Sequence, residues 1–306
     1  MTTLKFACLQ TDIVWESPPD NFDPVAARIA RAAELGADVI VLPEMFATGF
    51  SMNPSLAQDV DGPIASFLTA QAARHRVCII AGIMLTGSPR PANGALVFDR
   101  TGTVMARYHK VHLFAHAGEN EVLAPGDGPV VFALDGLRCS VFICFDLRFP
   151  ELFRPVAEQV DAMVVLASWP GSRQQHFDTL LEARAIENQC YVVGVNRVGQ
   201  GGGIAYDGGS AIIAPGGKAQ LTFATAAAPD VGSLQALVDR YRQPGPVQRA
   251  SLMSATLTGI RLRTLGLAPE PLAALQSLST ALLYTLTRSA PGSQGSTGPW
   301  PGHCDK

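Results

Sequence analysis

The sequence carries little charge and lacks the long apolar runs of membrane proteins. Charged residues make up 16% of its 306 residues, and the formal net charge at pH 7 is -3. This balance provides no strongly basic surface, so neither nucleic acid nor an anionic membrane is expected as a partner. No apolar run approaches the roughly 18 residues that a membrane-spanning helix needs. Residues 1–10 lack the apolar core of a signal peptide, and a cytoplasmic location is therefore expected.

Cysteine and histidine are scarce and lack the spacing of a structural framework. The six cysteines form no C-x-x-C pair and stand at positions 8, 78, 139, 144, 190 and 304. Most lie in apolar segments, which predicts reduced thiols rather than disulfides. His109, His112 and His116 share one loop but not the spacing of a zinc site, so no metal is expected. The glycine-rich stretch 199–203 has no following Lys-Ser/Thr pair and is interpreted as a loop, and no cofactor is expected.

Strand and helix patterns alternate along the chain up to about residue 243. The 47% hydrophobic content suffices for one large core or two modest ones. Helices are predicted at 24–35, 64–76 and 176–188, where apolar residues recur at helical spacing. Strands are predicted at 4–9, 39–42, 77–84, 95–98, 103–108, 141–143, 162–166, 191–196, 210–214 and 218–223. This order indicates an α/β fold with antiparallel hairpins mixed into the sheets.

A weak internal repeat accompanies this alternation. The segment ADVIVLP at 37–43 resembles VDAMVVLA at 160–167, and each follows a predicted helix. Two similar half-units packed sheet against sheet would explain the repeat, and so would a chance match between valine-rich strands.

The composition changes after residue 243, where QPGP at 243–246 breaks the preceding pattern. Leucines at 272, 275, 278, 282 and 286 predict one amphipathic helix, and residues 289–306 are rich in Gly, Pro and Ser and are expected to be disordered. We therefore divide the chain into a domain at 1–243 and a tail at 244–306. The tail resembles an unrelated sequence joined late, as a shifted reading frame could produce.

Four polar residues with related chemistry stand at or near the ends of predicted strands. Cys144 ends the apolar run at 141–143 and precedes a Phe-Pro-Glu helix start, whose positive end would favour a thiolate. The other three are Glu44, Lys110 and Glu119. A carboxylate can take the proton of a thiol, and a lysine can favour the thiolate and stabilise an oxyanion. If these side chains meet in a cleft, they form a set for acyl transfer on a cysteine; separately, each is an ordinary turn residue or buried thiol.

Four segments resemble the nitrilase (carbon–nitrogen hydrolase) superfamily. They are LPEMFATGF at 42–50, KVHLF at 110–114, ICFDLRFP at 143–150 and EARAIEN at 182–188. The first of them, together with ASWP at 167–170, is most similar to the omega-amidase branch. The resemblance covers about residues 3–243. It implies a four-layer α-β-β-α sandwich that pairs as a homodimer, followed here by an atypical C-terminal tail.

The resemblance implies a catalytic set of Glu44 as base, Lys110 as oxyanion partner, Cys144 as nucleophile and Glu119 as second glutamate. Glu121 is the alternative for the last role, because the position is defined by the segment LAPG at 123–126. The implied reaction is hydrolysis of the terminal amide of a small dicarboxylate, such as 2-oxoglutaramate, through a cysteinyl thioester.

Several further residues are candidates for the substrate pocket. The backbone N–H of Phe145 is expected in the oxyanion site, and the side chains of Tyr108, Trp169, Arg173 and His176 are candidates for the pocket wall. Asp146 and Arg148 are expected to form a buried ion pair that holds the turn after Cys144. Two alternatives for the function stay open: another substrate of the superfamily (a nitrile, an N-carbamoyl compound or a deaminated peptide amide), or a catalytically weak interaction or scaffold protein.

Overall fold

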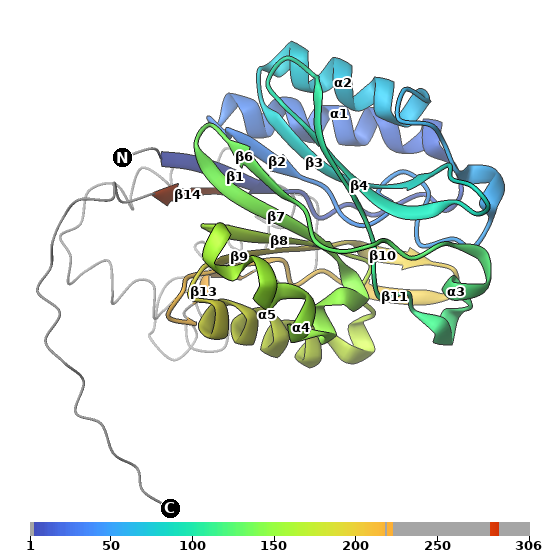
Figure 1. The fold of residues 1–306 in the computed structure, drawn as a ribbon. Coiled ribbons are helices and arrows are strands. Elements are labelled where there is room, and N and C mark those ends of the chain that lie inside the picture. Colours follow the sequence, from blue (N-terminus) through green and yellow to red (C-terminus); the bar gives the residue numbers. More distant parts are fainter. Residues whose placement is uncertain (1–2, 218, 223–281, 288–306) are drawn as a thin grey trace, which may run out of the picture.

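The computed structural model describes residues 3–217, 219–222 and 282–287. These residues form two six-stranded sheets that pack face to face, with helices on both outer faces (Figure 1). Helices α1 (Pro18–Glu34) and α2 (Pro63–His75) cover the first sheet, and α4 (Pro150–Phe153) and α5 (Gln174–Asn188) cover the second. The predicted four-layer α-β-β-α sandwich is confirmed.

The first sheet has the strand order β14-β1-β2-β3-β4-β5. Its strands are β1 (Thr3–Cys8), β2 (Val39–Val41), β3 (Cys78–Leu85), β4 (Ala92–Phe98), β5 (Val104–His109) and β14 (Leu282–Thr287). The second sheet has the order β13-β12-β9-β8-β7-β6. Its strands are β6 (Val131–Leu134), β7 (Leu137–Ile143), β8 (Ala162–Ala167), β9 (Tyr191–Asn196), β12 (Ala211–Ile213) and β13 (Ala219–Thr222).

Short elements lie between the main strands and helices, and several of them contribute residues to the site. They are the ribbon β10 (Val198–Gly201) with β11 (Ile204–Asp207), helix α3 (Glu119–Val122), and the 3-10 turns η1 (Pro54–Leu56), η2 (Ala115–Ala117), η3 (Cys144–Arg148), η4 (Arg154–Gln159) and η5 (Gly171–Arg173). The stretch at 199–203, predicted as a loop, thus belongs largely to a β-ribbon with its turn at 202–203.

The two sheets repeat one pattern of strand pairing. From β14 to β5, and again from β6 to β13, successive pairs are antiparallel, parallel, parallel, antiparallel and antiparallel. Strands β2 and β8, which follow the repeated aspartates, occupy the same third place. Asp38 accepts a hydrogen bond from the backbone N–H of Lys5, and Asp161 accepts one from that of Arg138. The topology therefore favours two half-units over a chance match.

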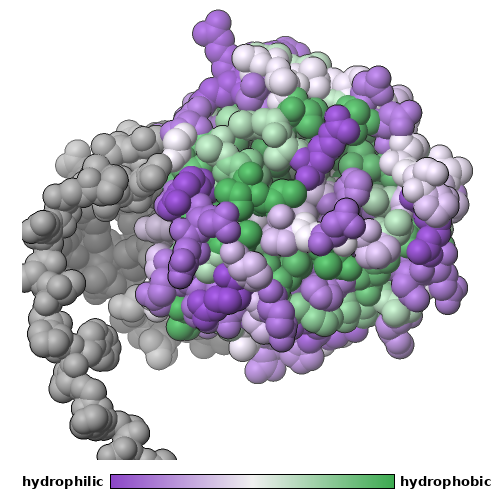
Figure 2. Space-filling view, in the orientation of Figure 1, coloured by the Kyte–Doolittle hydropathy of each residue, from purple (hydrophilic) through white to green (hydrophobic). Residues whose placement is uncertain are grey.

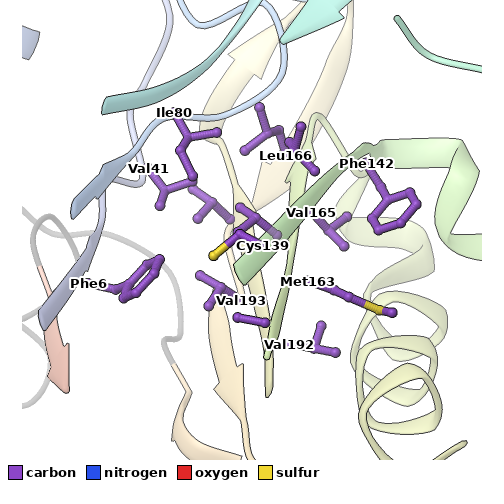
Figure 3. Packing of buried hydrophobic residues seen from close by; sticks show 14 of the residues in the cluster. Phe6, Val41, Ile80, Cys139, Phe142, Met163, Val165, Leu166, Val192 and Val193 are labelled. Atoms are coloured by element: carbon purple, nitrogen blue, oxygen red, sulfur yellow. The ribbon is translucent and has the colours of Figure 1, made fainter. Parts of the chain in front are cut away.

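Alternating side chains separate the core into layers. In β1, Phe6 and Cys8 face the second sheet, whereas Ala7 packs with the helices α1 and α2. In the second sheet, Cys139 points toward the first sheet and Met163 toward the helix side (Figure 3). Every residue from Val39 to Val41 in β2 is buried, since both faces of this central strand are covered. The paired sheets thus give a rigid base for residues at the strand ends.

Helix α1 begins at Pro18, earlier than the predicted start at residue 24. The tandem prolines Pro18 and Pro19 suit a first helical turn, where their missing N–H groups are not needed. Pro24 lies inside the helix and costs one backbone donor. Burial of Val25, Ile29 and Ala32 against the first sheet offsets that loss.

The predicted C-terminal helix is wrong at its end. Residues Leu282–Thr287 form strand β14, which pairs antiparallel with β1 from Thr3 to Cys8. Main-chain pairing along the free edge of β1 outweighs the helical leucine spacing. The rest of that predicted helix and the segment 289–306 lie outside the described residues.

Polar and apolar side chains intermix on the surface face drawn in Figure 2, as the low charge content leads one to expect. No helix within the described ranges is both long enough and apolar enough to cross a membrane. The described cysteines, at 8, 78, 139, 144 and 190, are free thiols.

Candidate active site

Cys144 lies at a sharp turn where β7 ends and η3 begins. Its backbone φ is 45°, in the left-handed region that residues other than glycine rarely adopt. The carboxylate of Asp146 holds this turn, because it accepts hydrogen bonds from the backbone N–H of Ile143 at 3.0 Å and from the Tyr108 hydroxyl at 2.7 Å. Arg184 of α5 donates to the carbonyl of Leu147 at 2.6 Å from the other side. The constrained turn presents Cys144 to the neighbouring pocket.

Glu44, Lys110 and Glu119 form one buried cluster next to this turn. Their side chains are 0% exposed. Lys110 Nζ donates to Glu44 Oε1 at 2.9 Å and to Glu119 Oε2 at 2.9 Å. Glu119 Oε2 also accepts the backbone N–H of Phe114 at 2.6 Å. The alternative, Glu121, is exposed, so Glu119 is the glutamate that joins the cluster.

Asn93 completes this cluster and was missed in the sequence. Its Nδ2 donates to Glu44 Oε1 at 2.8 Å and to Glu119 Oε1 at 2.7 Å. One amide group thus bridges two like charges that share a single lysine. The pair Asn93-Gly94 resembles a turn signal in the sequence, whereas it lies within β4.

The electrostatics of the site keep the thiol protonated. Burial raises the pKa of Cys144 well above its ordinary value, and the charge of Glu44 raises it further. Lys110 and a hydrogen bond from the backbone N–H of Ser168 lower this pKa, but by less. The predicted thiolate is therefore not the resting form. The Phe-Pro-Glu helix start that was expected to favour it is present as the short helix α4, but the 3-10 turn η3 (Cys144–Arg148) lies between that helix and the thiol.

Lys110 stays charged in the cluster. Burial by itself lowers the pKa of Lys110, and the carboxylates of Glu44 and Glu119 more than offset this, so that its pKa lies above the ordinary value. The backbone N–H of Ser168 also donates to Glu44 Oε2 at 2.9 Å. Since the same N–H interacts with Cys144, it holds a carboxylate oxygen beside the thiol.

A cavity of about 270 Å³ opens above Cys144 and Lys110. Its walls are mainly aromatic and apolar: Trp15, Phe50, Met52, Phe114, Phe145, Trp169, Ile204 and Tyr206, with Ser168, Pro170, Gly201 and Gly202. Of the predicted wall residues, Trp169 and Arg173 line it, and so does Phe145. Trp15, Phe50 and Tyr206 were missed because each comes from a different, distant segment.

Two guanidinium groups give the cavity a positive wall. Arg148 lies over the ring of Trp169 at 4.9 Å, and Arg173 lies over the ring of Phe114 at 5.2 Å. Within the described part of the chain, neither group pairs with a carboxylate. The predicted Asp146–Arg148 ion pair is absent there, since Arg148 Nη2 instead contacts His176 Nδ1 at 3.1 Å.

The remaining predicted residues, Tyr108 and His176, are not part of the cavity lining. Tyr108 is 1% exposed, and its hydroxyl is bound to Asp146. His176 contacts Arg148 from α5 rather than lining the cavity. Among the histidines of the loop, His112 stacks on Phe149 at 3.7 Å. No group of three or more His, Cys, Asp or Glu side chains within the described residues could hold a metal ion.

Comparisons with known proteins find similar sequences among carbon-nitrogen hydrolases. A family model described as carbon-nitrogen hydrolase matches residues 5–228. Omega-amidase YafV of Escherichia coli K12 is 36% identical over 219 residues, which cover 71% of this chain and 84% of that protein. 2-Oxoglutaramate amidase of Bacillus subtilis is 36% identical over 216 residues, covering 69% of this chain and 83% of that protein.

Solved structures share the fold. XC1258 from Xanthomonas campestris, described as a CN-hydrolase superfamily protein with an arsenic adduct in its active site, superimposes with a TM-score of 0.70 at 33% identity, covering 74% of this chain and 88% of the other. A mutant amidase from Nesterenkonia sp. AN1, which carries acrylamide added at its active-site cysteine, superimposes with a TM-score of 0.67 at 26% identity. The match covers 78% of this chain and 100% of that amidase chain.

Proposed function

The chain belongs to the carbon–nitrogen hydrolase family, and from this premise we propose that it is an amidase that hydrolyses the terminal amide of a small dicarboxylate. One observation carries the proposal. The cavity joins a cysteine beside a buried Glu–Lys–Glu cluster to two guanidinium groups that have no carboxylate partner among the described residues. The relatives named omega-amidase and 2-oxoglutaramate amidase support the same class of substrate.

In the first proposed stage, the sulfur of Cys144 attacks the amide carbon and Glu44 accepts the thiol proton. A neutral thiol needs such a base, and Glu44 Oε2 lies beside it on the Ser168 N–H. Lys110 and the backbone N–H of Phe145 stabilise the negative oxygen of the tetrahedral intermediate. The C–N bond then breaks, and the leaving nitrogen takes the proton from Glu44 and departs as ammonia.

In the second stage, water hydrolyses the thioester. The oxygen of the water attacks the acyl carbon, and Glu44 accepts a proton from this water. The C–S bond breaks, and the proton returns to the sulfur of Cys144, so that the free carboxylic acid leaves and the enzyme is restored. Glu119 and Asn93 keep Lys110 and Glu44 in place through both stages.

The substrate class follows from the cavity walls. The aromatic walls suit a short carbon chain, and a carboxylate at its far end would pair with Arg148 and Arg173. Arginine binds carboxylates well because its planar donors match their two oxygens. A cavity of about 270 Å³ fits a molecule of a few carbon atoms, such as 2-oxoglutaramate.

Ammonia release from a substrate panel tests this function. The panel contains 2-oxoglutaramate, glutamine, a simple nitrile and an N-carbamoyl amino acid, with wild type and Cys144→Ala compared on each. We expect release that favours the keto-acid amide and disappears in Cys144→Ala while the circular-dichroism spectrum is unchanged. Preference for another member of the panel would contradict the proposed substrate, and activity retained by Cys144→Ala would contradict the nucleophile. A folded wild-type protein that releases ammonia from no member of the panel would favour the scaffold alternative.

We also propose, from the family resemblance, that the protein is a cytoplasmic homodimer whose hydrolase domain spans residues 1–243, with strand β14 of the tail added to the first sheet. Size-exclusion chromatography of the full chain tests the dimer, and elution as a monomer would contradict it.

A further inference from the structure

The ribbon of β10 and β11 forms one wall of the cavity, through Gly201, Gly202, Ile204 and Tyr206. Two contacts fix its position. The backbone N–H of Val198 donates to the carbonyl of Thr11 at 3.0 Å. Asp207 packs so closely on Gly171 that a Cβ at that glycine would lie 2.2 Å from the carboxylate. The ribbon is therefore held against the segment that carries Trp169 and Arg173.

Tyr206 is the polar side chain of this wall, and its ring cannot move freely. The residue is 3% exposed, and the Arg197 guanidinium lies 4.5 Å from its ring centroid. Arg197 is itself buried and donates from Nη2 to the carbonyls of Ile13 and Gln200. No hydrogen bond of the Tyr206 hydroxyl is found among the described residues, and none contributes to its pKa. A fixed phenol without a protein partner, on the wall of a reaction cavity, is available to a ligand.

Tyr206 lines the same cavity as Cys144 and Arg173. Burial raises the pKa of Tyr206 to about 12, with Glu44 and Cys144 acting in the same direction and Arg197 and Arg173 opposing. The hydroxyl is therefore protonated at neutral pH and can donate. A substrate with its amide at Cys144 and its carboxylate at Arg173 would therefore extend through the cavity that the Tyr206 side chain lines.

We propose that Tyr206 is a specificity-determining residue that donates a hydrogen bond to an oxygen substituent on the substrate carbon chain, between the scissile amide and the carboxylate. The inference rests on the proposed function and deepens it. Tyr206 then selects the monoamide of a 2-oxo dicarboxylic acid over the unsubstituted monoamide of the same length. An acceptor oxygen satisfies the buried phenol, whereas a methylene group leaves it without a partner.

The test compares 2-oxoglutaramate with glutaramate, which has hydrogens in place of the 2-oxo group. Steady-state kcat and KM are measured for wild type, Tyr206→Phe and Tyr191→Phe. The first variant removes only the hydroxyl and keeps the ring against Arg197, and the second removes a tyrosine hydroxyl on β9, outside the cavity lining. We expect Tyr206→Phe to lower kcat/KM for 2-oxoglutaramate by roughly 10-fold, chiefly because KM rises. The value of kcat/KM for glutaramate should change by less than about 2-fold. Tyr191→Phe is expected to match wild type on both.

Equal losses on both amides, or no loss on either, would overturn the role of Tyr206 and leave the proposed amidase intact. A wild type that hydrolyses neither amide would overturn the proposed function itself. Circular dichroism and thermal unfolding of Tyr206→Phe exclude a general loss of structure as the cause of any change.

Discussion

At the scale of single residues, the site combines a charged, ion-paired lysine with an uncharged cysteine nucleophile. Lys110 is charged and paired with two carboxylates, and the Cys144 thiol is neutral beside them. In the proposed mechanism this arrangement differs from a preformed thiolate–imidazolium pair, because the proton leaves the sulfur only as the bond to carbon forms. Asn93 makes it possible, since its two amide hydrogens divide between Glu44 and Glu119. A base therefore stays available within a site that also holds a buried cation.

The first prediction concerns the titration of this thiol. Because burial and Glu44 raise the pKa of Cys144, its thiolate should form only above the ordinary thiol pKa of about 8.5. Glu44→Gln removes the repelling charge and should move the step to lower pH. The measurement is the ultraviolet thiolate absorbance of each protein minus that of the same protein with Cys144→Ala, followed against pH. A wild-type step below pH 7 would contradict the neutral resting thiol.

The sign of the accompanying stability change follows from linkage. The native pKa of Cys144 is raised above that of the unfolded chain, so the native state retains its proton longer as the pH rises. Its contribution to stability is complete below about pH 8.5 and is lost above it. Denaturant unfolding of wild type and Cys144→Ala should therefore show a difference in stability that changes only in alkaline buffer.

At the scale of elements, the sequence predicts what lies within one segment and misses what two segments make together. Strand β9 was predicted with its bounds, and Glu44 and Cys144 were found because apolar runs end beside them. Asn93 was missed because β4 begins at Ala92, before the predicted start at residue 95, and Asn93 is placed there by pairing with the separate strand β3. The ribbon wall with Tyr206 was missed for the same reason: a glycine-rich stretch becomes a β-ribbon only against Thr11 and Gly171.

One contact between elements sets the position of the proposed base. Gly82 of β3 lies so close to the turn after β2 that a Cβ there would be 2.6 Å from Glu44 Cα and 2.7 Å from the backbone nitrogen of Met45. Backbone atoms cannot yield as a flexible side chain can, so the turn would have to shift. Glycine at this position thus brings the Glu44 carboxylate within reach of Lys110.

Gly82→Ala should therefore lower kcat by at least about 10-fold, because a displaced base acts poorly even when the fold survives. It should also lower the free energy of unfolding by about 1–3 kcal/mol through overpacking. Gly128→Ala is the matched control, since a Cβ at that position meets nothing within 4 Å. The measurements are ammonia release and urea unfolding. Loss of stability with an unchanged kcat would show that the approach of β3 does not position Glu44.

At the scale of the whole molecule, the first sheet is completed by residues far along the chain. Strand β14 pairs with β1 over Thr3 to Cys8, and β1 lies between β14 and the central strand β2. Figure 1 shows β14 beside β1, and the strand order places β14 at the edge opposite β5. The composition boundary near residue 243 therefore does not coincide with the end of the folded unit, because part of the predicted tail supplies a strand. Strand β14 could not be predicted from local sequence, because it forms by pairing with β1, which lies near the other end of the chain.

Removal of residues 282–306 should leave β1 as an unprotected edge, whereas removal of residues 288–306 keeps β14. The shorter protein should unfold at a temperature roughly 5–10 °C lower, because six residues lose their main-chain pairing. It should also associate more strongly with rising concentration, since an unpaired strand offers its backbone to other chains. Thermal unfolding and size-exclusion chromatography over a range of concentrations measure both effects. Equal unfolding temperatures for the two truncations would show that β14 adds no stability, and the hydrolase unit would then end before residue 282.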